Sequence, residues 1–178
     1  MNPINEKIRK TSRFVAIITK ILYITVIIAL CVESVGIIWY VISPESSSFT
    51  WGGIKIVSPY FFSGSSEIAT EFFTGICGQS FFVAILIVTN RIFKDISREY
   101  TPFLPQNIRR MKKIALLLLL DSIISPPIDL AIRASISAST SSLSGFSTEM
   151  TILAIVIYCF ALIFQYGVVL QQQSDETL

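Results

Sequence analysis

Two carboxylates stand in stretches of sequence that are otherwise almost wholly apolar. Glu33 lies within the run 14–42, and Asp121 directly follows the uninterrupted run 114–120. A carboxylate at membrane depth is costly, and it is therefore treated first as a candidate functional group. Each also has a purely structural alternative: Glu33 close to the outer membrane surface, and Asp121 protonated or hydrogen-bonded beside a neighbouring serine.

Polar side chains in the other apolar runs complete a candidate intramembrane polar site, which consists of Glu33, Asp121, Gln79, Tyr158 and Gln165. Tyr158 and Gln165 follow Ala154 and Ala161 at intervals of three and four residues, so a helix would place these four side chains on one face. Small and polar residues on one face favour close packing against another helix in a membrane.

The chain offers little for catalysis or for metal binding. It contains no His, which removes the commonest general base and the usual ligand of transition metals. Its three cysteines, Cys31, Cys77 and Cys159, have no CxxC spacing and sit in apolar segments, as packing residues do. No phosphate loop of the GxxxxGK[ST] type is present. We expect no enzymatic activity, no catalytic residues, no cofactor and no metal.

The composition is that of a membrane protein. Of the 178 residues 52% are hydrophobic and only 15% are charged, with a mean hydropathy of +0.67. A soluble domain has about 25% charged residues, and a membrane span needs about 20 apolar residues. We predict an all-α membrane protein: a single domain over 1–178 that forms a four-transmembrane-helix bundle. The predicted spans are about 14–42, 70–93, 112–133 and 149–170.

The connections carry their own signals. The outer loop 43–69 contains two β-prone segments around Gly52-Gly53, which predicts a short extracytoplasmic β-hairpin between the first two helices. The inner loop is predicted over 94–111. In the third span Pro126 and Pro127 are expected to kink or end the helix, and the freed carbonyls near Ser122 then need a new hydrogen-bond partner.

Positive charges set the orientation. Of the fourteen Lys and Arg residues, all but Lys55 and Arg133 lie in the N-terminal segment or around the inner loop. The positive-inside rule predicts a multi-pass protein of the cell (cytoplasmic) membrane with both termini in the cytoplasm. The net charge of +2 does not suggest direct binding of nucleic acid. The candidate residues for cytosolic docking are Arg109, Arg110, Lys112, Lys113 and Asp175, and the four cations have anionic lipid as an alternative partner.

Two motifs are more specific than hydropathy. Pro102, Phe103, Asn107 and Arg110 match a "Pro-Phe-x-x-x-Asn-x-x-Arg" pattern, with Met111 where a basic residue is expected. After the fourth span the matching residues are Gly167, Leu170, Gln171, Asp175, Thr177 and Leu178. Both motifs resemble those of a family of small four-span bacterial membrane proteins classed as a domain of unknown function. The resemblance implies a cytosolic helix-turn-helix regulator as a partner, and it implies no established activity.

Two classes of function remain open at this stage. The first is a regulatory or sensory membrane protein that binds a cytosolic transcriptional regulator or a membrane partner, with the outer hairpin as its sensing element. The alternative is a small transporter or a self-protection (immunity or resistance) protein that uses Glu33 and Asp121 as an intramembrane carboxylate site. Four spans would need to form a homo-oligomer to enclose a path through the bilayer.

Overall fold

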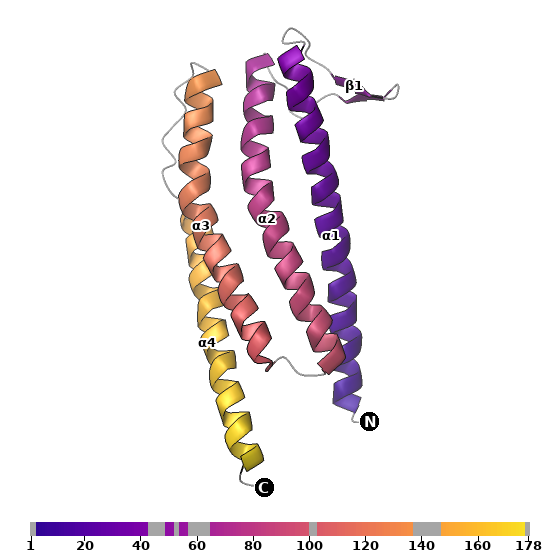
Figure 1. Ribbon diagram of the computed structural model, residues 1–178, viewed down its shortest axis with the longest axis vertical. Helices are drawn as coiled ribbons and strands as arrows, with labels where there is room; N and C mark the ends of the chain where they lie inside the picture. The colour runs from indigo at the N-terminus through magenta and orange to yellow at the C-terminus, as the bar shows by residue number, and fades with distance from the viewer. Residues whose placement is uncertain are drawn as a thin grey trace.

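Four long α-helices make up most of the structure (Figure 1). The computed structural model describes residues 3–42, 49–51, 54–56, 65–99, 103–136 and 147–176. The helices are α1 (Pro3–Ile42), α2 (Ser65–Glu99), α3 (Pro105–Ile136) and α4 (Thr148–Glu176). Each contains a stretch that is long and apolar enough to cross a membrane. The prediction of four membrane-spanning helices is confirmed at this level.

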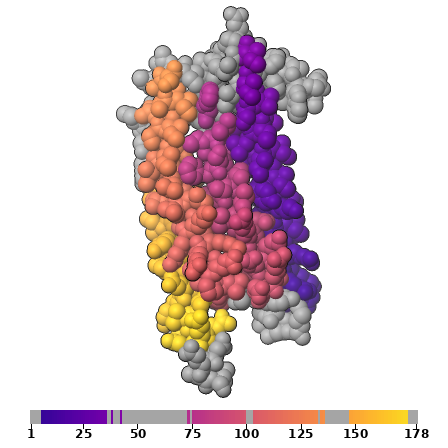
Figure 2. Space-filling view, in the orientation of Figure 1, coloured from indigo at the N-terminus to yellow at the C-terminus, as the bar shows by residue number. Residues whose placement is uncertain are grey.

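The helices lie side by side in chain order and form an open row (Figures 1 and 2). The closely packed pairs are α1 with α2, α2 with α3, and α3 with α4. Within the described part of the chain, neither α3 nor α4 packs closely on α1. Both chain termini lie at the same end of the row, which we call the terminal end.

Few side chains are fully buried, because each helix keeps one face turned outward. A core of Val88, Ile92, Ile114, Leu118 and Ala154 joins α2, α3 and α4. Outward residues such as Leu116 and Ile163 are 55% and 64% exposed. In water such a surface would be unfavourable, but among lipid tails an apolar side chain loses nothing by facing outward.

Two short strands lie between α1 and α2 along the chain. β1 (Phe49–Trp51) pairs antiparallel with β2 (Ile54–Ile56), and Phe49 is opposite Ile56. The turn predicted at residues 52–53 lies outside the described residues. The extracytoplasmic location of this segment stays a prediction.

α3 continues through Pro126 and Pro127 to Ile136, so of the two expected effects, a kink or an end of the helix, the second does not occur. Pro126 has no N–H, and the carbonyl four residues earlier, that of Ser122, therefore loses its helical partner. The backbone N–H of Ser147 donates to this carbonyl at 3.4 Å. The expected replacement partner is thus present, and it comes from the residue just before α4.

This contact also fixes the position of α4 along α3. α4 begins beside Ser122, near the middle of α3, and runs antiparallel to it beyond the start of α3 (Figure 1). The hydroxyl of Thr151, one turn into α4, lies within hydrogen-bond distance of both Ser122 Oγ (3.0 Å) and the Ser147 carbonyl (3.0 Å). Ser122 is fully buried. The two helices are therefore staggered rather than level.

The helices are longer than the predicted spans. The predicted inner loop 94–111 is helical over 94–99 and again over 105–111. Polar and basic residues at a helix end do not prevent helix formation outside a membrane, and Pro105 is at the first position of α3, where a proline is well tolerated.

Candidate functional site

Residues of the two sequence motifs meet at the terminal end. A Cβ built on Gly167 would lie 2.7 Å from Cε1 of the Phe103 ring, so only glycine leaves room for this ring. Phe103 also packs against Phe164, with ring centroids 5.5 Å apart and an interplanar angle of 51°. The segment that leads into α3 is thereby held against α4.

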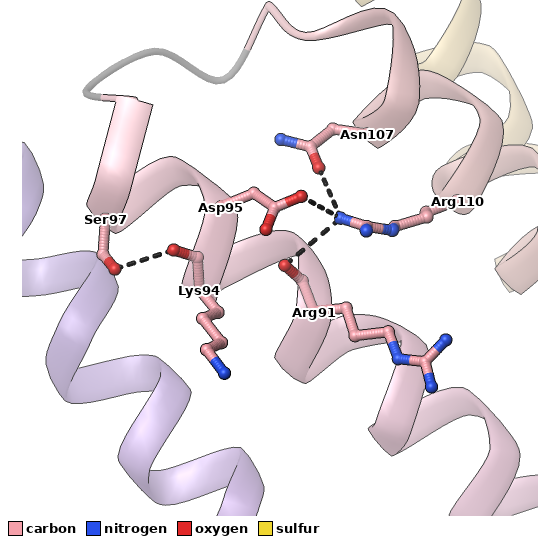
Figure 3. Close-up of polar contacts among 6 residues, drawn as sticks. All are labelled: Arg91, Lys94, Asp95, Ser97, Asn107 and Arg110. Atoms are coloured by element: carbon pink, nitrogen blue, oxygen red, sulfur yellow. Dashed lines mark hydrogen bonds and ion pairs between the residues drawn. The ribbon is translucent and has the colours of Figure 1, made fainter.

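A second part of the first motif ties α3 to α2 (Figure 3). Nη1 of Arg110 donates to the carboxylate of Asp95, to Oδ1 of Asn107 at 3.2 Å and to the carbonyl of Arg91 at 3.3 Å. The Arg110 and Asp95 side chains are only 19% and 23% exposed. An ion pair this sheltered holds its two helices in one register.

Asn107 is 1% exposed, and its Nδ2 has no hydrogen-bond partner in the structure as described. A buried amide donor without a partner is unfavourable by about 1–3 kcal/mol. Its oxygen is committed to Arg110. We name the group Asp95, Phe103, Asn107, Arg110 and Gly167 the motif cluster, since all but Asp95 belong to the two motifs.

Tyr158 and Gln165 lie around a single cation on the neighbouring helix. Nζ of Lys112 donates to Oε1 of Gln165 at 2.8 Å and lies 6.0 Å from the centroid of the Tyr158 ring. The second distance is at the outer limit of a cation–π contact. These two predicted site residues therefore contribute to the packing of α3 on α4.

Glu33 and Gln79 are also brought together, on α1 and α2. Nε2 of Gln79 donates to Oε1 of Glu33. Gly75, one turn away on α2, leaves the space for this carboxyl group, because a Cβ there would lie 3.2 Å from Glu33 Oε2. Glu33 Oε2 and Gln79 Oε1 are buried and have no partner among the described residues.

Asp121 takes no part in either group in the contacts that the structure describes. It accepts a hydrogen bond from Oγ of Ser125 in its own helix, as its structural alternative predicts. The five residues of the predicted intramembrane site thus occupy three separate places: Glu33 with Gln79, Asp121 with Ser125, and Tyr158 and Gln165 with Lys112.

The predicted docking residues do not form one group either. Arg110 and Lys112 are engaged in contacts between helices. Arg109 and Lys113 are exposed and, within the described ranges, have no hydrogen-bond or ion-pair partner for their side chains. Asp175 lies within α4, but its side chain falls outside what the structure describes.

Sequence reasoning missed Asp95, and a signal for it existed. Asp95 lies four residues before the end of α2, and Arg110 five residues after the start of α3. Opposite charges at similar distances from the connection of two antiparallel helices can face each other when the helices pack. Asn90 on α2 donates to Thr19 Oγ1 at 3.1 Å and to the Ala16 carbonyl, and these two hydrogen bonds join α2 to α1.

No family model, no curated protein and no solved structure matches this chain. The likeness of the two motifs to a four-span family therefore stays an expectation from the sequence.

Proposed function

We propose that the chain is a regulatory or sensory membrane protein whose terminal end binds a cytosolic transcriptional regulator. The observation that carries the proposal is the motif cluster, in which residues from two motifs more than fifty positions apart in the sequence meet at one place. The cluster holds α2, α3 and α4 together at the terminal end, which would give a partner one fixed shape to bind.

The charges at this end suit an acidic partner surface. Arg109 and Lys113 extend from α3 next to the motif cluster, and both are exposed. α4 continues for nine residues beyond Gly167, to Glu176, and so provides a further helical surface at the terminal end. By the positive-inside rule this end faces the cytoplasm, where a transcriptional regulator would be found.

The motif cluster also couples three helices. Arg110 bonds to Asp95 on α2, and Phe103 packs on Gly167 of α4. A shift of α3 along α2 would therefore disturb the contact with α4 as well. In this proposal an extracytoplasmic β-hairpin formed by β1 and β2 receives the signal, and the relative position of α2 and α3 carries it to the terminal end.

The test is capture, by the detergent-solubilised full chain, of a helix-turn-helix regulator of the kind that the motif resemblance implies. We expect Arg109→Gln with Lys113→Gln to weaken capture several-fold, since two attractive charges are lost. The matched control is Lys7→Gln with Lys10→Gln, which removes two exposed cations of α1 that also lie at the terminal end. Equal capture by all three chains, or no capture above a bead control, contradicts the proposal.

One observation favours the transporter or self-protection alternative. Glu33 Oε2 and Gln79 Oε1 are both acceptors, both buried and both without a donor in the described part of the chain. Protonation of Glu33 would create an O–H donor where these two oxygens lack one. Because the row of helices is open, a path would require a homo-oligomer.

Because Glu33 bonds to Gln79 and Asp121 only to Ser125 in the described contacts, the alternative is narrowed to Glu33. In this form it predicts that Glu33→Gln abolishes flux or resistance and that Asp121→Asn leaves it intact. The readout is proton-coupled flux in proteoliposomes or survival of cells exposed to the toxic substrate. Unchanged activity in the Glu33→Gln chain excludes the alternative.

A further inference from the structure

A pocket of ≈ 680 Å³ lies between α1 and α2 at the terminal end. Five of its lining residues are cations: Arg9, Arg13, Lys20, Lys94 and Arg98. The first three follow one face of α1, and the last two are one turn apart on α2. The pocket has no counterpart in the sequence analysis, which used these residues only to orient the chain.

Among the described residues, nothing neutralises the charge of the pocket. No Asp or Glu is among the residues that the structure describes as its lining. Two acidic side chains at this end are engaged elsewhere: Glu6 pairs with Lys10 at 2.7 Å, and Asp95 pairs with Arg110. Within the described residues none of the five cations makes an ion pair. Several like charges around one cavity repel each other, and an anion placed among them removes that repulsion.

The remaining lining groups are neutral and fit the same chemistry. Asn90 is held in place because its Nδ2 donates to the Ala16 carbonyl and to Thr19 Oγ1. Tyr23 contributes a hydroxyl group, whereas the hydroxyl of Ser97 donates to the Lys94 carbonyl at 2.8 Å (Figure 3). Arg and Lys side chains together with hydroxyl donors are the groups that bind phosphate oxygens in proteins.

We propose that this pocket binds a phosphate-bearing anion. Two sources have this chemistry: the headgroup of an anionic phospholipid, and phosphate free in solution. The lining extends from Arg9 to Tyr23, about 21 Å along the helix at 1.5 Å per residue. Ile17, also in the lining, is 52% exposed and continues into the outward apolar face of α1. The pocket is therefore long enough for a headgroup with the first part of its lipid tails, and free phosphate would occupy only part of it.

The experiment measures thermal unfolding of the detergent-solubilised full chain against the concentration of three probes. These are dihexanoyl-phosphatidylglycerol, dihexanoyl-phosphatidylcholine and inorganic phosphate. A ligand that binds the folded chain raises the unfolding midpoint with concentration, and the dependence gives Kd. The pocket variant is Arg13→Gln, Lys20→Gln, Lys94→Gln. The matched control, Lys7→Gln, Lys10→Gln, Arg91→Gln, removes three cations at the same end outside the pocket.

We expect the anionic lipid to bind wild type and control alike, and to bind the pocket variant about a hundredfold more weakly, since each cation contributes about fivefold. Phosphatidylcholine, which has no net charge, should bind far more weakly than phosphatidylglycerol. If inorganic phosphate raises the unfolding midpoint as much as the anionic lipid at equal concentration, the ligand is a free anion. If phosphate raises the midpoint less than the lipid does, the ligand is the lipid headgroup.

Three results would overturn the proposal. In the first, neither the anionic lipid nor phosphate binds the wild-type chain. In the second, the two lipids bind equally well, and in the third, the control and the pocket variant lose affinity equally. The first two need no variant, so a chain that fails to fold cannot leave the question undecided.

Discussion

The ion pair between Asp95 and Arg110 should contribute measurably to stability, and a double-mutant cycle can isolate its contribution to the free energy of unfolding. Breaking a fully buried pair costs about 3–5 kcal/mol, and an exposed pair is worth at most about 1 kcal/mol. With side chains 19% and 23% exposed, this pair lies between the two, and we expect a coupling energy of about 2 kcal/mol.

The two single changes should differ. Asp95→Asn removes the charge and leaves Arg110 bonded to Asn107 and to the Arg91 carbonyl. Arg110→Met also takes the donor from Asn107, which is 1% exposed, and this adds about 1 kcal/mol. We expect losses of about 2 and about 3 kcal/mol, and the double variant should lose no more than Arg110→Met alone.

The assay is reversible unfolding of the full chain by sodium dodecyl sulfate in mixed micelles, followed by far-ultraviolet circular dichroism. Glu6 and Lys10 supply the control cycle, because their side chains are 50% and 72% exposed. That cycle should give about 0.3–0.5 kcal/mol. A coupling energy for Asp95 and Arg110 no larger than this value would refute the reasoning.

Three further predictions use the same unfolding assay. Gly167→Val should destabilise by about 1–2 kcal/mol through its clash with Phe103, and should cost almost nothing in a Phe103→Ala chain. Asn90→Leu removes two interhelical hydrogen bonds and should cost about 1 kcal/mol, which an unchanged unfolding midpoint would contradict. Thr151→Val keeps the shape but removes the hydroxyl near Ser122, and a loss of about 0.5–1 kcal/mol is expected.

The number and type of the helices could be predicted because each apolar run exceeds what a bilayer requires. Their relative heights could not. Hydropathy places α3 and α4 level, but the contacts of Ser147 with Ser122 and of Gly167 with Phe103 shift α4 toward the terminal end. Such contacts depend on which side chains meet, and a hydropathy profile contains no information about this.

The candidate site shows the same limit. A helical face can be derived from residue spacing, but the neighbour toward which that face turns cannot. Glu33 and Gln165 were grouped because both are polar residues in apolar runs. In the row of helices α1 and α4 are the first and the last, and their polar residues bond to α2 and α3 instead.

The cations illustrate a second reason. The positive-inside rule uses only their number, so it treats Arg109 and Arg110 as equivalent. In the structure Arg110 holds two helices together and Arg109 is exposed. Burial and the position of a counter-charge separate the two, and both are properties of the packed helices.

The stagger of α3 and α4 has a consequence for the thickness of the surrounding membrane. Between Ile114, just after the basic residues at the start of α3, and Ser122, where α4 begins, the two helices share an apolar height of only about 12 Å. The hydrocarbon layer of a bilayer is about 30 Å thick. Hydrophobic mismatch is therefore concentrated at this pair, and lipids with shorter chains should suit it better than lipids with longer ones.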